Sequence, residues 1–204
     1  MDLPLSPGQP ALLAALEAAF DREGKVARAI EVLGPIAERD VLLLDADRGR
    51  REGELRAMGG RVRSVLGVDL RSVPLGETDV IVACWTGLGL GRAAAAPVLA
   101  GLTQPLRPGG RVVLVEDYGR DDLSHLFADP DREARSVLAS ERRGAMLPAG
   151  FKVRVLHCFW TFPDLPAAGA LLTALFPATG PEVAARLRRP RIVHKVAVYH
   201  RTAD

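Results

Sequence analysis

Short apolar runs alternate along the chain with segments whose apolar residues recur at helical spacing. The runs are rich in β-branched residues and leucine and predict buried strands at residues 40–45, 62–68, 78–85, 111–116, 151–160 and 191–201. The other segments predict helices at residues 11–20, 25–33, 50–58, 92–101, 131–142, 167–176 and 181–187. Because strands and helices alternate, the pattern predicts an α/β fold with a mostly parallel sheet and helices on both faces. The order of the elements does not determine how the last two strands pair.

Length and composition indicate one globular domain. The chain has 204 residues, of which 48% are hydrophobic, enough for a single sizeable core. The net charge of +2 is too small to indicate a nucleic-acid partner. The N-terminal residues lack the basic start and apolar core of a signal peptide, and no apolar run approaches the roughly 20 residues that cross a bilayer. We therefore expect a soluble, cytoplasmic protein with no membrane partner.

The cysteines and histidines do not indicate a disulfide or a metal site. Cys84 and Cys158 lie in apolar strand-like runs, which favours free thiols in a reducing compartment. His157 and Cys158 are neighbours in a predicted strand, so they point to opposite faces and cannot bind one metal ion together. Because no CxxC or HxxxH spacing occurs elsewhere, we expect no metal.

The most informative segment is residues 41–50, with the sequence VLLLDADRGR. An apolar run is followed at once by small, acidic and glycine residues, and then by a predicted helix. Strand, tight turn and helix N-terminus is the arrangement with which open α/β folds hold an adenosine cofactor, because glycines let the backbone approach the ligand and the free helix amides face it. Three residues are at the positions where glycines are expected: Asp45, Asp47 and Gly49.

Several later motifs resemble class I S-adenosylmethionine-dependent methyltransferases of the type 11 kind. The sequence LRPGGR at 106–111, followed by the apolar run 112–115, resembles the turn and fifth strand of that family. The sequences GVD at 67–69, VPL at 73–75 and TDVIV at 78–82 resemble its approach to the fourth strand. GFKV at 150–153 and the strand at 191–201 resemble its last two strands. The resemblance covers about residues 28–201 and implies a Rossmann-like fold and S-adenosylmethionine as cofactor.

The chain also departs from that family. Its first loop usually has three glycines, of which only Gly49 is present here. The acid that ends the second strand and binds the ribose falls at or near Leu66, unless Asp69 has this role. Residues 59–77 are few for the usual seven-stranded sheet, so one strand-helix unit is expected to be shortened. We expect one domain over residues 1–204, with residues 1–35 as a helical lid or extension and 36–204 as the core.

The resemblance also implies which residues form the site. The cofactor-binding candidates follow the first, second and fourth strands of the family pattern and are Asp45, Asp47, Gly49, Asp69, Cys84 and Trp85. Methyl transfer needs proximity and orientation, and in some cases a base that deprotonates the acceptor. The acidic segment after residue 116 contains groups able to act as acid, base or donor, so Asp117, Tyr118 and His125 are the catalytic candidates for a small-molecule acceptor.

Other interpretations of these segments remain open. The sequence DADRGRRE is also typical of a capped helix in which Asp47 is the N-cap and Glu52 or Glu54 pairs with arginines. Arg48, Arg50 and Arg51 beside a helix N-terminus would also suit a phosphate-bearing ligand. The acidic loop that follows residue 116 is likewise typical of helix capping.

Two functions compete with methyl transfer. The first is a non-catalytic protein of the same fold with a decayed cofactor loop, which acts as a binding or dimerising module and would form a homodimer. The missing loop glycines and the missing ribose acid favour it. The second is a nicotinamide-dependent oxidoreductase, which would need the glycine pattern even more strongly and therefore ranks last.

Overall fold

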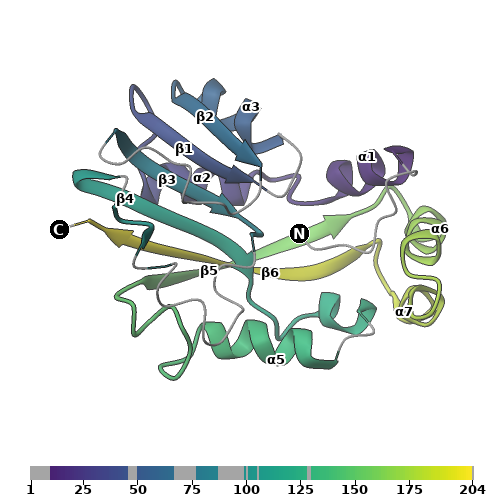
Figure 1. Ribbon diagram of the computed structural model, residues 1–204. Coiled ribbons are helices and arrows are strands. Elements are labelled where there is room, and N and C mark those ends of the chain that lie inside the picture. Colours follow the sequence, from purple (N-terminus) through teal and green to yellow (C-terminus); the bar gives the residue numbers. More distant parts are fainter. Residues whose placement is uncertain are drawn as a thin grey trace.

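The computed structural model describes residues 10–45, 50–66, 77–86, 99, 101–104, 106–127 and 130–203. These residues form a six-stranded mixed sheet in the order β2-β1-β3-β4-β6-β5, with helices on both faces (Figure 1). The strands are β1 (Asp40–Asp45), β2 (Arg61–Leu66), β3 (Thr78–Cys84), β4 (Leu106–Asp117), β5 (Lys152–Thr161) and β6 (Arg191–Thr202). The helices are α1 (Pro10–Ala19), α2 (Lys25–Leu33), α3 (Arg50–Ala57), α5 (Pro130–Ala139), α6 (Leu165–Leu175) and α7 (Gly180–Arg186), with a 3₁₀ helix η2 (Asp122–Leu126).

The sheet confirms the predicted fold class and settles the pairing of the last strands. Strands β2, β1, β3 and β4 are parallel to their neighbours, whereas β6 lies antiparallel between β4 and β5. The described part of the chain therefore contains one strand fewer than the usual sheet of the resembled family. This agrees with the shortened unit expected between β2 and β3.

Two core clusters cover the two faces of the sheet. The first core cluster joins residues such as Leu43, Val82 and Val113 to α1, α2, α3 and α6. The second core cluster joins the intervening residues, such as Leu42 and Leu114, to the end of α5 and to residues 145–151. Alternate residues of one strand thus enter different clusters, and this is why the central strands are continuous apolar runs.

The N-terminal helices have different positions. Helix α2 packs on the sheet through Val26, Ala29 and Ile30, which are fully buried or nearly so, and it belongs to the layer of the first core cluster. Helix α1 lies beside α6 and β5 (Figure 1), and the residue that follows it, Phe20, forms a bridge with Trp160. The structure thus places α2 in the layer that covers the sheet and α1 beside α6.

The largest difference from the sequence-based elements is at the start of β4. The LRPGGR segment before the strand expected at 111–116 was interpreted as a turn, but the strand already begins at Leu106 and shifts register between Thr78 and Val80 of β3. Arg107 holds the start of β4 against the neighbouring strands, because its Nη1 atom lies 2.9 Å from carboxylate oxygens of both Asp40 and Asp79. The turn prediction was wrong because these ion pairs involve residues from three separate strands. The helix expected at 131–142 is also shorter, and the one expected at 92–101 lies mostly outside the described residues.

Helix α3 contains a glycine that offers a stability prediction. Gly53 lies inside the helix, and a Cβ atom added there would meet nothing within 4 Å. Glycine in a helix interior is about 0.8–1 kcal/mol less favourable than alanine. We expect Gly53→Ala to raise the free energy of unfolding by about that amount, measured by urea denaturation. A decrease would show that α3 approaches another part of the chain more closely than its described neighbours indicate.

Candidate functional site

The parallel strands end at one edge of the sheet. Asp45 is level with Leu66 of β2 and with Cys84 of β3, and Cys84 is level with Val115 of β4. The segments that leave these strands therefore start next to one another, as they do where open α/β sheets bind their ligands. Asp47, Gly49 and Asp69 lie in segments outside the described residues, and of Asp45 only the backbone is described.

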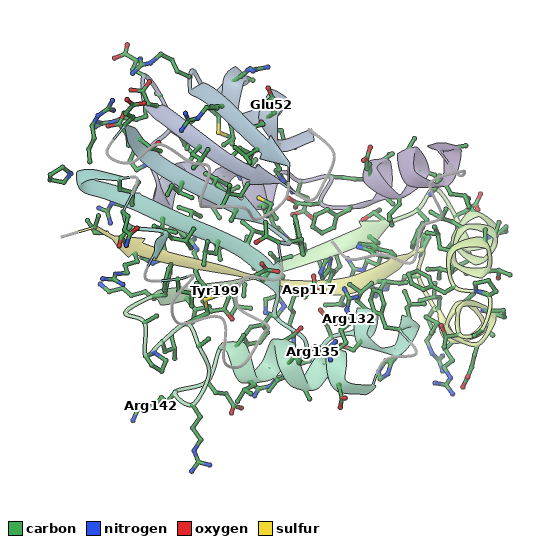
Figure 2. All side chains as sticks on the ribbon, in the orientation of Figure 1. Glu52, Asp117, Arg132, Arg135, Arg142 and Tyr199 are labelled. Atoms are coloured by element: carbon green, nitrogen blue, oxygen red, sulfur yellow. The ribbon has the colours of Figure 1, made fainter. Side chains whose placement is uncertain are left out.

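Asp117, at the end of β4, is the centre of a buried polar network. Its Oδ1 atom accepts a hydrogen bond from Trp85 Nε1 at 2.8 Å and lies 3.0 Å from His194 Nε2. Its Oδ2 atom accepts from Arg132 Nη2 of α5 at 2.7 Å, and Figure 2 shows the two labelled residues close to each other. Only 9% of Asp117 is exposed. The Asp117 network thus joins β3, β4, α5 and β6.

The tautomer of His194 follows from its second neighbour. Trp160 Nε1 lies 3.3 Å from His194 Nδ1, and an indole nitrogen can only donate. Nδ1 must therefore accept, which leaves the proton of the neutral ring on Nε2, where it is donated to Asp117. His194 and Trp160 are fully buried, so this chain of hydrogen bonds belongs to the core.

The network makes Asp117 a weak base. Burial by itself raises the pKa of Asp117, but the hydrogen bond from His194 and the positive charge of Arg132 outweigh it and hold the pKa well below its usual value. A general base works best when its pKa is near the working pH, and its oxygens must reach the acceptor. Both oxygens of Asp117 already accept hydrogen bonds from protein groups. The geometry therefore suits Asp117 to positioning Trp85 and Arg132 rather than to proton transfer.

Trp85 is held firmly at the end of β3. Its φ of +49° is a left-handed conformation that is rare for a large side chain. Its backbone N–H donates to Val115 O at 2.7 Å, its ring meets the Phe20 ring edge-on at 5.6 Å, and the Arg51 guanidinium lies 5.6 Å from the ring centre. Trp85 is 5% exposed and Arg51 is 1% exposed. The indole is thus part of the core and its faces are in contact with protein.

Cys84 and Cys158 are both buried thiols that form no disulfide bond. Cys84 belongs to the first core cluster, beside Trp85. Burial, and then the charge of Asp21, raises the pKa of the Cys158 thiol to about 12, so this thiol is neutral and unreactive.

Two arginines of α3, Arg51 and Arg56, pair within the helix. Arg51 Nη1 lies 2.5 Å from Glu54 Oε2, and Arg56 pairs with Glu52. These ion pairs confirm the expectation that Glu52 or Glu54 would pair with arginines. Because Arg51 is buried and paired, it does not face solvent where a phosphate group would approach. The N-cap role of Asp47 lies outside the described residues.

The acidic loop after Asp117 covers the part of β6 that extends beyond the end of β4. Asp121 Oδ2 accepts from the backbone N–H of Lys195 at 2.6 Å, and Asp122 Oδ2 accepts from that of Val193 at 3.2 Å. The backbone N–H of Tyr118 donates to Lys195 O at 3.0 Å. Asp121 also caps η2 by accepting from Ser124 N, and burial raises its pKa. These two carboxylates therefore accept the β6 hydrogen bonds that a neighbouring strand would otherwise accept. Asp121 is also the N-cap of η2, as the capping interpretation proposed.

The structure does not bring the three catalytic candidates together. Asp117 hydrogen-bonds to Trp85 of the first core cluster, whereas Tyr118 is half-buried and packs against the second core cluster. His125 is exposed on η2, whose Leu123 and Leu126 face the first core cluster. Of the sequence-based candidates, the structure joins Asp117 to Trp85 and places Cys84 beside them.

A small cleft adjoins the Asp117 network. It lies between η2 and α5, and its open space, solvent included, is about 230 Å³. Polar residues that line it are Asp117, Asp121, Ser124, Arg132, Glu133 and Ser136. Asp117 and Arg132 at the cleft are already paired with each other, so the cleft belongs to the network described above.

Sequence reasoning missed Arg132 and gave Arg51 a different role. Arg132 lies in a polar segment with no motif, and Arg51 was one of three arginines considered for a phosphate-bearing ligand, not a buried neighbour of Trp85. The only local signal was that Arg51 follows the cofactor-type loop. Their positions depend on contacts between distant segments, which sequence spacing does not contain.

The strand order is that of one known fold. Six strands in the order 2-1-3-4-6-5, with the next-to-last position antiparallel, match the Rossmann-like sheet of class I methyltransferases. A proposed type II methyltransferase from Anaeromyxobacter dehalogenans has a similar structure, with a TM-score of 0.53 and 18% identity over 87% of this chain and 95% of that one. The chain has the class I methyltransferase fold.

A second solved structure shares this methyltransferase fold. It is a proposed sarcosine dimethylglycine methyltransferase from Galdieria sulphuraria, with a TM-score of 0.50 and 11% identity over 88% of this chain and 84% of that one. No family model and no curated protein matches the sequence. At these identities the similarity concerns the fold alone.

The described residues were also compared with the requirements for a metal site and for a membrane-spanning helix. No group of three or more histidine, cysteine, aspartate or glutamate side chains among them could hold a metal ion. None of the helices described is both long and apolar enough to span a membrane.

Proposed function

We propose that this protein transfers a methyl group from S-adenosylmethionine to a small molecule. The observation that carries the proposal is the methyltransferase fold itself, in which β1, β2 and β3 end level with one another. The bound cofactor would supply an activated methyl group. Its polar contacts would come from Asp45, Asp47, Gly49 and Asp69, because Cys84 and Trp85 are part of the core and can form only an apolar wall.

The chain's own residues have different parts in this proposal. Asp117 positions Trp85 and Arg132, so the wall beside the cofactor is rigid before the ligand binds. Tyr118 and His125 remain the candidates that could contact the acceptor, and they approach the strand ends from different sides. Proximity and orientation supply most of the rate in such a displacement, so a rigid wall is a sufficient contribution from Asp117.

Calorimetric titration with S-adenosylmethionine and with its demethylated product tests the cofactor proposal. We expect saturable one-site binding that is lost in Asp69→Ala and weakened in Gly49→Val. Glu182→Gln is the matched control, because Glu182 is exposed on α7, and we expect it to bind like the wild type. The absence of heat at millimolar ligand, with a folded protein, would refute methyl transfer.

A non-catalytic role is the second candidate, and one observation favours it. The Trp85 ring is covered by Phe20 and Arg51, and its N–H is used by Asp117, so three protein groups occupy the surroundings of a residue expected beside the cofactor. Together with the missing loop glycines, this suits a fold kept for binding or dimerisation. The absence of cofactor binding, with a dimer seen by sedimentation, would support this role.

A further inference from the structure

We propose that Glu116, Tyr118 and Tyr199 form the acceptor subsite, on the face of the sheet opposite Asp117, and that it takes a small uncharged molecule with an apolar body and one hydroxyl group beside a second oxygen. The inference rests on the proposed methyl transfer. It places the methyl acceptor beside Glu116, which neighbours the sequence-based candidate Asp117 in β4 but lies on the other face of the strand.

The register of β4 and β6 places these residues on one face. Glu116 pairs with Ala197, and Leu114 pairs with Tyr199, so Glu116 and Tyr199 are diagonal neighbours on adjacent strands. Such neighbours are roughly 7–8 Å apart, within reach of long and aromatic side chains. Leu114, Ala197 and Tyr199 all belong to the second core cluster, against which Tyr118 also packs. Figure 2 shows Tyr199 at a distance along the sheet from Asp117.

Tyr199 is a buried donor that needs an acceptor. Its side chain is fully buried, and its hydroxyl has no hydrogen-bond partner among the described residues. Buried polar groups in folded proteins almost always have a partner, so such a group requires an explanation. Burial, and then the charges of Glu116 and Tyr118, raises the pKa of Tyr199, so the hydroxyl stays protonated and able to donate. An oxygen of a bound molecule would accept the hydrogen bond that the Tyr199 hydroxyl can donate.

Glu116 is the proton acceptor of the subsite. It is 2% exposed, it lies one residue before the end of β4, and its Oε1 atom accepts from Thr86 Oγ1 at 3.4 Å. This places a carboxylate at the carboxyl edge of the sheet, where the cofactor is proposed to bind. A carboxylate in such surroundings disfavours an anionic ligand and suits one that donates a hydrogen bond.

The step balances with these groups and the cofactor. The O–H bond of the acceptor breaks and its proton passes to a Glu116 carboxylate oxygen. The electron pair left on oxygen forms the new bond to the methyl carbon. The carbon–sulfur bond of the cofactor breaks, and its electron pair stays on sulfur, which becomes a neutral thioether. Tyr199 donates to the second oxygen of the acceptor throughout, and the Tyr118 ring contacts its apolar body.

The two tyrosines permit a direct test, because the chain contains only Tyr118 and Tyr199. Protein labelled with ¹³C at the tyrosine ζ carbon gives two signals, which Tyr199→Phe assigns. We expect 2-methoxyphenol, added with the demethylated cofactor product, to shift both signals saturably. Phenol, which lacks the second oxygen, should bind about tenfold more weakly, and benzoate should not bind. In Tyr199→Phe the preference for 2-methoxyphenol over phenol should disappear.

The variants separate this subsite from the cofactor proposal. Glu116→Gln should weaken 2-methoxyphenol binding at least about tenfold and leave calorimetric binding of the cofactor product within about twofold, whereas Glu182→Gln on α7 should change neither. Cofactor binding without a shift of either tyrosine by either phenol would overturn the subsite and leave the proposed function standing. Tyrosine shifts without cofactor binding would support the subsite as a binding site and refute methyl transfer.

Discussion

Replacing Asp117 with alanine is expected to lower the free energy of unfolding by about 3–5 kcal/mol, the range for removing one partner of a buried charge pair. The change leaves the Trp85 and His194 N–H groups without their acceptor and takes the carboxylate away from Arg132. A buried donor that loses its acceptor still has the full free-energy penalty of desolvation, with no hydrogen bond to offset it. Urea denaturation followed by circular dichroism measures the loss.

A nearby aspartate provides the control. Asp122 is exposed and accepts one backbone hydrogen bond, from Val193, so Asp122→Ala should cost only about 1 kcal/mol or less. Tryptophan fluorescence should also change in Asp117→Ala, because the Trp85 indole loses its hydrogen bond, and should not change in Asp122→Ala. A loss below about 1 kcal/mol in Asp117→Ala would contradict the positioning role. Asp117 would then become a stronger candidate for direct catalysis.

Gly180→Ala is the second change with a large expected effect, at least about 3 kcal/mol of destabilisation. A Cβ atom at Gly180 would lie 2.2 Å from the carbonyl oxygen and 2.6 Å from the carbonyl carbon of Leu172 in α6. Both are backbone atoms, so no side chain can move aside, and α7 must shift away from α6. Because α6 and α7 pack against each other and on the first core cluster, this shift would disturb the core beside β5 (Figure 1). Thermal and urea unfolding would measure the effect.

Another glycine between the same helices gives the matched comparison. A Cβ atom at Gly169 in α6 would meet Ala184 Cβ of α7 at 3.9 Å, an ordinary van der Waals contact. Because alanine is the better helix former, Gly169→Ala should raise the free energy of unfolding by about 0.5–1 kcal/mol. If both variants proved equally stable, α6 and α7 would not pack as closely as the Gly180 contact requires.

Much of the fold could be predicted from local sequence signals. Helix α2 and strand β1 have the predicted bounds, and β3, β5 and β6 differ from prediction by one or two residues. These elements have a clear signal because a strand buried on both faces is a continuous apolar run. Where prediction failed, as at the start of β4, ion pairs of Arg107 with Asp40 and Asp79 extended a strand across a glycine-rich turn. Such pairs depend on strand order, which no local pattern contains.

The candidate site was less predictable than the fold. Sequence reasoning selected Trp85 and Asp117 separately, for different roles, and did not show that one donates to the other at 2.8 Å. It assigned Tyr118 to the same cluster as Asp117, although Asp117 hydrogen-bonds to Trp85 of the first core cluster and Tyr118, just after the strand, packs against the second. The capping role of the acidic loop was foreseen, but its covering of the part of β6 beyond β4 was not.

The sequence by itself therefore determined the α/β architecture, the order of the elements and the edge of the sheet at which a ligand would bind. These follow from the period of the apolar residues and from turn residues, which act over a few positions. Only the tertiary structure decided the antiparallel position of β6 between β4 and β5, and with it the neighbours of Asp117 and Tyr199. Residues 85, 117, 132 and 194 meet because strands far apart in the chain pair side by side. Hydrogen bonds between such residues depend on distances that exist only after folding.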